Sequence, residues 1–282
     1  MKSRWLINLL LFVTVAILIL VARYEPGIEK TQTQNVTPIT ADDVTQLRVE
    51  RQLRDELILE KDKEGFWWIA REPRLPADSF QVRALTRLAE QTVVRSYPAS
   101  ELDLAQLELD PPRTSLMLNT TRIDFGGIDA LESLRYLRIG DRVSLVPDLY
   151  LHLVEAGYTH FVRRKLLPQR ARISSLSLPG QDIHQTESGW AVTPDSEIEA
   201  DILKQFIEHW EDATAINVRE TEPSAVGETV FIHLVGQTKP IELVVIAREP
   251  ELVLARPAFG IEYRMGDLAT RLLEPSTTND TP

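Results

Sequence analysis

The sequence predicts an α+β fold made of two tandem similar units of antiparallel strands plus a helix, preceded by one transmembrane helix. Three observations support this prediction: an apolar run near the N-terminus, short segments in which apolar and polar residues alternate, and one order of elements that occurs twice. The gaps between expected strands have hairpin length and leave no room for the crossovers that parallel strands need, so the sheets should be antiparallel.

The apolar run extends from Trp5 to Ala22 and contains no charged residue. As a helix these roughly 18 residues span about 27 Å, near the lower limit for crossing a bilayer. Lys2 and Arg4 precede the run, so the positive-inside rule places the N-terminus in the cytoplasm and the body outside it. A cleaved signal peptide is the alternative, but its apolar region is normally shorter and ends in a small-x-small motif. We therefore expect residues 1–22 to be a cytoplasmic stub and membrane anchor.

Composition marks the boundaries of the folded body. Residues 23–42 are mostly polar, contain two prolines and a glycine and lack an apolar period, so we expect a linker. Residues 274–282 meet the same criteria and should form a disordered tail. Between these segments we expect a first α+β unit at 43–168 and a second at 169–273.

The two expected units share landmarks at nearly constant spacing. Four pairs of landmarks show this spacing: Trp67 and Trp190 are 123 positions apart, Pro73 and Pro194 are 121 apart, Thr92 and Thr214 are 122 apart, and Asp148 and Asp267 are 119 apart. Self-similarity at a fixed period indicates a tandem duplication. Each unit should then contain three strands, a helix, a β-meander and a short terminal helix.

Helix starts are predicted from capping residues. Asp78 should cap the main helix of the first unit, while Ser196 and Glu199 form a capping box for that of the second. The terminal helices are expected to begin at Asp148 and Asp267.

Charge and composition exclude several classes of function. The formal net charge is −11, or −13 without Lys2 and Arg4, which argues against binding to nucleic acid or to anionic lipid through counterion release. The chain has no cysteine, which excludes disulfides, thiolate zinc sites and cysteine nucleophiles. None of the five histidines has a partner at metal-ligand spacing, and no nucleotide-binding loop or serine-hydrolase motif occurs. We expect no catalytic, cofactor-binding or metal residues and therefore no enzyme and no cofactor.

Two groups of residues are candidates for binding. The first is the local positive cluster Arg163, Arg164 and Lys165, which is either a solvated connector between the units or a docking point for an acidic partner or lipid headgroup. The second is a set of strand tryptophans that either stack on a sugar or belong to the core: Trp67, Trp68 and Trp190.

The chain resembles the DUF4340 family of bacterial envelope proteins over residues 43–168. The motifs that carry the resemblance are Trp67, Ile69, Pro73, Pro76, Ala77 and Asp78, then Pro111-Pro112, Phe125-Gly126, Arg135-Tyr136, Val143 to Val146 and Arg164 to Leu167. The resemblance implies no catalytic residues, because the family has no assigned activity. It implies an accessory role, since such proteins are often encoded beside ABC-transporter components similar to those of gliding-motility systems.

The leading hypothesis is a non-enzymatic accessory or scaffold protein of a bacterial inner-membrane transport or envelope complex. Its partners would be the membrane and other proteins of that complex, and its body would face the periplasm. A periplasmic binding module for a cell-wall or carbohydrate ligand is the alternative, and an envelope hydrolase is a third reading. A cleft lined by the tryptophans would favour the binding module, whereas their burial in a core would favour the accessory protein.

Overall fold

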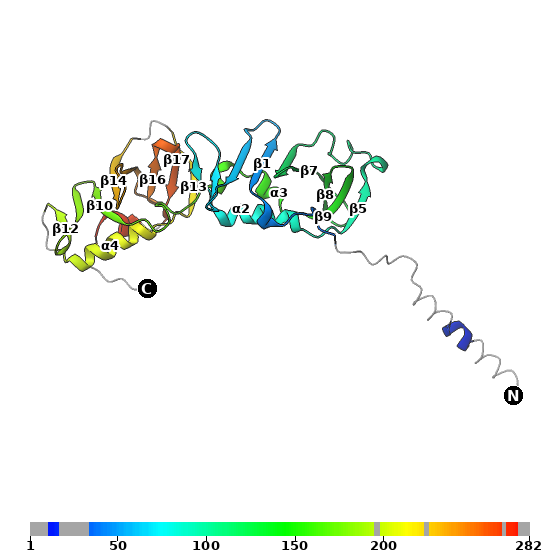
Figure 1. The fold of residues 1–282 in the computed structure, drawn as a ribbon, viewed down its shortest axis with the longest axis horizontal. Coiled ribbons are helices and arrows are strands. Elements are labelled where there is room, and N and C mark those ends of the chain that lie inside the picture. The colour runs from blue at the N-terminus through cyan, green and yellow to red at the C-terminus, as the bar shows by residue number, and fades with distance from the viewer. Residues whose placement is uncertain (1–10, 17–33, 195–197, 223–225, 267–268, 276–282) are drawn as a thin grey trace.

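The computed structural model of the protein describes residues 11–16, 34–194, 198–222, 226–266 and 269–275. Their body consists of two β-sheets that lie one after the other along the long axis of the molecule (Figure 1). The chain completes the first sheet before it enters the second.

The first sheet has nine strands in the order β4-β3-β2-β1-β6-β7-β8-β9-β5, with antiparallel neighbours. In β1, Leu47 and Val49 are fully buried and Arg48 between them is not, as expected for a sheet with one face on the core. The strands are β1 (Gln46–Arg51), β2 (Leu57–Lys61), β3 (Trp67–Ile69), β4 (Leu75–Pro76), β5 (Arg95–Pro98), β6 (Thr114–Leu118), β7 (Thr121–Ile128), β8 (Leu134–Ile139) and β9 (Arg142–Pro147).

The second sheet has eight strands in the order β12-β11-β10-β14-β15-β16-β17-β13, again antiparallel. The strands are β10 (Ile173–Leu178), β11 (Gln181–Thr186), β12 (Gly189–Thr193), β13 (Asn217–Glu220), β14 (Glu228–Leu234), β15 (Ile241–Ala247), β16 (Val253–Arg256) and β17 (Ile261–Arg264).

The two sheets have the same topology. If β1, β2 and β3 are matched to β10, β11 and β12, and the later strands in turn, the two orders agree and the first sheet adds only β4 at its edge. Trp67 in β3 and Trp190 in β12 therefore occupy corresponding strands. In each sheet the strand after the helix returns to close the far edge, where β5 pairs with β9 and β13 with β17.

The segments that lead into the two sheets also correspond. Residues 34–37 pair with the end of the first helical region, where Asn35 bridges Thr92, and Lys165 bridges Thr214 in the same way in the second unit. Part of the expected 23–42 linker thus packs on the first unit, while the linker residues before 34 lie outside the described residues.

Helices are short and lie on one side of the sheets. Asp78 accepts hydrogen bonds from the backbone N–H groups of Phe80 and Gln81 and so caps the first main helix. The second main helix begins at Ala200 with Glu199 at its N-cap and no side-chain cap bond, and the expected cap residue Ser196 lies outside the described residues. The helices are α2 (Ser79–Thr86), α3 (Leu151–Val154), α4 (Ala200–Asp212) and α5 (Ala269–Leu273), with 3-10 turns η1 (Ala41–Asp43), η2 (Arg87–Glu90), η3 (Ala99–Glu101), η4 (Tyr158–Phe161) and η5 (Pro257–Phe259).

The expected α+β class is wrong, because the described chain is predominantly antiparallel β-sheet with few helical residues. Asp148 illustrates the reason. Its carboxylate was expected to start a terminal helix, but it pairs with the guanidinium of Arg135, and only the single turn of α3 follows. Its counterpart Asp267 lies outside the described residues.

The transmembrane helix expected at Trp5 to Ala22 is not supported by the described part of the chain. No helix within that part is long and apolar enough to cross a membrane. Most of the expected span lies outside the described residues, and residues 11–16 are helical.

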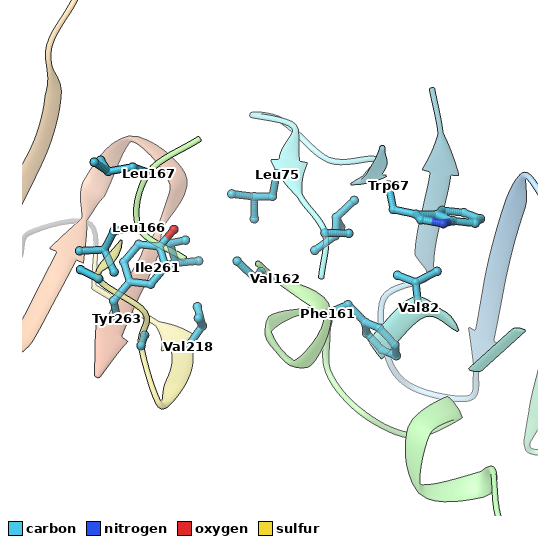
Figure 2. Packing of buried hydrophobic residues seen from close by; sticks show 14 of the residues in the cluster. Trp67, Leu75, Val82, Phe161, Val162, Leu166, Leu167, Val218, Ile261 and Tyr263 are labelled. Atoms are coloured by element: carbon cyan, nitrogen blue, oxygen red, sulfur yellow. The ribbon is translucent and has the colours of Figure 1, made fainter. Parts of the chain in front are cut away.

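One apolar core runs through both units. Figure 2 shows the junction, where Phe161, Val162, Leu166 and Leu167 of the segment between the sheets lie between side chains of the two units. Residues of the first unit at this junction include Trp67, Leu75 and Val82, and those of the second include Val218, Ile261 and Tyr263. The segment is therefore part of the core.

Candidate functional site

A groove of about 630 Å³ lies at the junction of the two units. Its walls come from three places: the hairpin between β2 and β3, the start of α2, and the connecting segment, by which we mean residues 161–169. The volume falls in the range of pockets that hold small ligands or a few side chains of a partner.

Aromatic side chains form one wall of the groove. Phe80 on the first turn of α2 is 74% exposed and Phe66 in the hairpin is 42% exposed, whereas Trp67 is only 7% exposed. Trp68 is half-buried. The phenylalanines, rather than the tryptophans, thus offer the larger accessible apolar surface.

Asp62 holds the hairpin in shape. Its Oδ1 accepts hydrogen bonds from the backbone N–H groups of Glu64 and Phe66, both at 2.9 Å, and its Oδ2 accepts the indole N–H of Trp68 at 2.7 Å. The bond from Trp68 is the main cause that lowers the pKa of Asp62, because it favours the ionised carboxylate. The guanidinium of Arg74 lies over the ring of Trp68, 4.8 Å from its centroid, and covers one face of the indole.

The connecting segment forms the opposite wall and is fixed by backbone pairing on both sides. The N–H of Asp78 donates to the carbonyl of Phe161 at 2.7 Å, and the N–H of Arg163 donates to that of Pro76 at 2.9 Å. Toward the second unit, the N–H of Leu166 donates to the carbonyl of Ala213 at 3.1 Å. The three cationic residues, read from sequence either as a solvated connector or as a docking point, therefore lie on a segment whose backbone is paired with both units.

The three cations of this wall differ in their partners. Arg164 Nε lies 3.7 Å from Asp78 Oδ2, and Lys165 Nζ lies 3.0 Å from Asp212 Oδ1. Arg163 makes no ion pair with any described residue, and its Nε is buried without a hydrogen bond. Among the three cations of this wall, Arg163 is therefore the one without a carboxylate partner in the described part of the chain.

A second hollow of about 330 Å³ adjoins the groove. Both hollows are lined by Trp67, Ser79 and Phe80, so the exposed ring of Phe80 stands between them. A bound segment that passes over Phe80 would reach both.

The structure brings together two of the candidate groups that the sequence suggested. Trp67 and Trp68 share the groove with the cluster at 163–165, whereas Trp190 lies in β12 and packs half-buried against the core. Sequence reasoning missed the two phenylalanines. The signal available for Phe80 was its position on the first turn of a helix, off the apolar face made by Val82 and Leu85.

The titratable groups of the groove are the carboxylates of Asp62, Glu64 and Asp78 and the three cations of the connecting segment. Within the described residues, no three His, Asp or Glu side chains are grouped in a way that could hold a metal ion. His160, on the neighbouring turn η4, shares a hydrogen bond with Gln81 at 3.1 Å. Burial, and then the charge of His152, keep the pKa of His160 below its ordinary value.

No protein-family model, curated protein or solved structure matches this chain. The resemblance to the DUF4340 family accordingly stays an expectation from sequence motifs. The function has to be inferred from the groove.

Proposed function

We propose that the protein is a non-enzymatic accessory protein of a bacterial inner-membrane transport or envelope complex, with its body on the periplasmic side. In this proposal the groove holds a segment of a partner protein. Exposed aromatic rings line the same groove as three cationic residues, although these cations follow Phe80 in the chain by 83 positions or more. This observation carries the proposal.

Aromatic and arginine side chains are the residues that most often anchor protein interfaces. Phe80 and Phe66 leave much of their rings in water, and covering a phenylalanine completely contributes about 1.5–3 kcal/mol. Phe80 lies on α2, Phe66 donates its backbone N–H to Asp62, and the cations lie on the paired connecting segment. Little conformational entropy is therefore lost when a partner binds. These features favour a preformed docking groove.

The alternative, a module that binds a cell-wall or carbohydrate ligand, has weaker support from the geometry. Stacking of a sugar requires an open indole face. Trp67 is nearly buried, and one face of Trp68 is covered by Arg74. The accessible aromatic surface belongs to phenylalanines, which suits the side chains of a protein segment.

Photo-crosslinking in cells tests the proposal. A photoreactive amino acid in place of Phe80 should give a discrete crosslinked partner in the membrane fraction. The matched control is the same amino acid at Leu53, which is fully exposed in the β1–β2 hairpin and far from the groove. The crosslink from position 80 should weaken when Phe66→Ala is added, because the partner loses part of the aromatic wall.

The opposite result is equally clear. Identical products from positions 80 and 53, or no product from position 80, would contradict a docking groove. Saturable quenching of tryptophan fluorescence by soluble peptidoglycan fragments, lost in Trp68→Phe, would instead support the ligand-binding module.

A further inference from the structure

Arg163 differs from its neighbours on the connecting segment because its guanidinium is half-buried without a carboxylate. The Nε atom of Arg163 makes no hydrogen bond, and the side chain of Arg163 forms no ion pair within the described ranges of the chain. Arg164 and Lys165 are each paired with an aspartate. A guanidinium keeps its proton at every physiological pH, so Arg163 cannot relieve its burial by becoming neutral.

A second half-buried cation lies near Arg163. Arg256, at the end of β16, stacks over the ring of Phe259 at 4.2 Å. Burial is the main cause that lowers the pKa of Arg163, and the charge of Arg256 lowers it further, against an opposing effect of Tyr263. Two positive charges partly removed from water repel each other more strongly than in bulk solvent, and a bound anion would offset that repulsion.

We propose that Arg163 forms an anion subsite of the groove, and that its ligand is a carboxylate of a partner protein. The segment that carries this carboxylate also carries an aromatic side chain, which packs on Phe66 and Phe80. The inference rests on the proposed function, because it names the chemistry of the segment that the groove holds. A carboxylate matches the fork of a guanidinium with two parallel hydrogen bonds.

Charge complementarity favours a protein segment over a lipid surface. The chain has a formal net charge of −11, so a broad anionic bilayer surface would be repelled by most of the protein. A short acidic segment meets only the groove, which is lined by three carboxylates and three cations. Asp62 already accepts the indole N–H of Trp68 and Asp78 already pairs with Arg164, whereas Arg163 has no carboxylate partner among the described residues.

Two labelled peptides of equal length test the subsite on the purified full-length protein by fluorescence anisotropy. One carries a tryptophan followed by two aspartates, and in the other both aspartates are replaced by asparagine. The wild-type protein should bind the acidic peptide at least about tenfold more tightly, which is the gain expected from one charge-assisted pair. Arg163→Gln should remove this preference, and a circular dichroism spectrum equal to that of the wild type shows that the variant is folded.

Lys165→Gln is the matched control, because it removes the same charge two positions away from a residue already paired with Asp212. Its affinity for the acidic peptide should fall less than about twofold.

Three results would overturn the inference. If both peptides bind equally to the wild type, the groove binds a segment but has no anion subsite. If neither peptide binds, the docking groove fails together with its subsite. If Arg163→Gln lowers binding to phosphatidylglycerol vesicles relative to phosphatidylcholine vesicles while peptide binding is unaffected, the anion is a lipid headgroup and not a protein carboxylate.

Discussion

Trp68 donates its indole N–H to the carboxylate of Asp62 at 2.7 Å, and this bond ties the ring to the hairpin that forms the aromatic wall of the groove. The same carboxylate accepts the backbone N–H groups of Glu64 and Phe66. One side chain therefore determines both the path of the hairpin and the orientation of the indole.

Replacing Asp62 should loosen this wall. In Asp62→Ala the two backbone donors and the indole N–H lose their acceptor, so we expect a lower melting temperature and more efficient quenching of tryptophan fluorescence by acrylamide. Glu64→Ala is the control in the same hairpin, since Glu64 is exposed, and it should change neither quantity. Equal effects of the two substitutions would show that the hydrogen bonds of Asp62 are not what orders the hairpin.

Arg135 and Asp148 form a largely buried bidentate pair, with Nε to Oδ1 at 2.6 Å and Nη2 to Oδ2 at 2.7 Å. The third guanidinium nitrogen donates to the carbonyl of Gly126 at 2.5 Å. Asp148→Ala leaves a buried unpaired cation and should lower the unfolding free energy in urea by about 2–3 kcal/mol. Glu56→Ala, which breaks the exposed pair with Arg48, should cost less than about 1 kcal/mol. A smaller loss for Asp148→Ala than for Glu56→Ala would contradict the burial argument.

Stability should depend on pH through His160. His160 is an exposed residue, but partial desolvation of its imidazole, and then the charge of His152, lower its pKa. Near the ordinary value of about 6.5 the folded state therefore binds fewer protons than the unfolded chain. The resulting stabilisation is present above about pH 6.5 and is lost as the pH falls through the lowered pKa of the folded state. Urea unfolding between about pH 7.5 and 5.5 should therefore show a steeper loss in the wild type than in His160→Gln. Equal slopes for the wild type and His160→Gln would contradict this assignment.

Trp210 links α4 to the C-terminal helix. Its side chain is fully buried, and its indole N–H donates to the carbonyl of Leu272 at 2.8 Å. Trp210→Phe removes this bond and leaves a small cavity, so the unfolding free energy should fall by about 2–3 kcal/mol. Trp190→Phe offers the same chemical change at a half-buried position and should cost less, as measured by urea unfolding. A larger fall in the unfolding free energy for Trp190→Phe than for Trp210→Phe would show that Trp210 is not the tryptophan that contributes most to the stability of the second unit.

The strands and their repeated order could be predicted from sequence because alternation is a local signal. Leu47, Arg48 and Val49 show it directly, with two buried residues around one that is not. The balance of helix and strand cannot be predicted in the same way, because a residue suited to capping a helix does not ensure that the helix forms. Asp148 has the chemistry of a helix cap, but a guanidinium 13 positions earlier in the chain, on β8, competes for it. Such competition is decided by tertiary structure.

The groove could be predicted only in parts. The cluster at 163–165 and the pair Trp67 and Trp68 stood out as unusual residue types, but nothing local shows that they face each other. Their meeting depends on the backbone pairing of Arg163 with Pro76, which joins segments 87 positions apart. Phe80 could not be predicted as a groove residue, because a phenylalanine near a helix is ordinarily assigned to the core.

The connecting segment should make the two units unfold as one. Its N–H groups bond the first unit at Pro76 and the second at Ala213, and its apolar side chains belong to the core that runs through both sheets. We expect calorimetry of the wild type to show a single transition. Two glycines inserted between Arg164 and Lys165 shift the pairing of the segment with one unit, and two transitions should then appear. The same insertion after Leu53, in an exposed hairpin, should leave one transition, whereas unchanged melting after the first insertion would mean that the units fold independently.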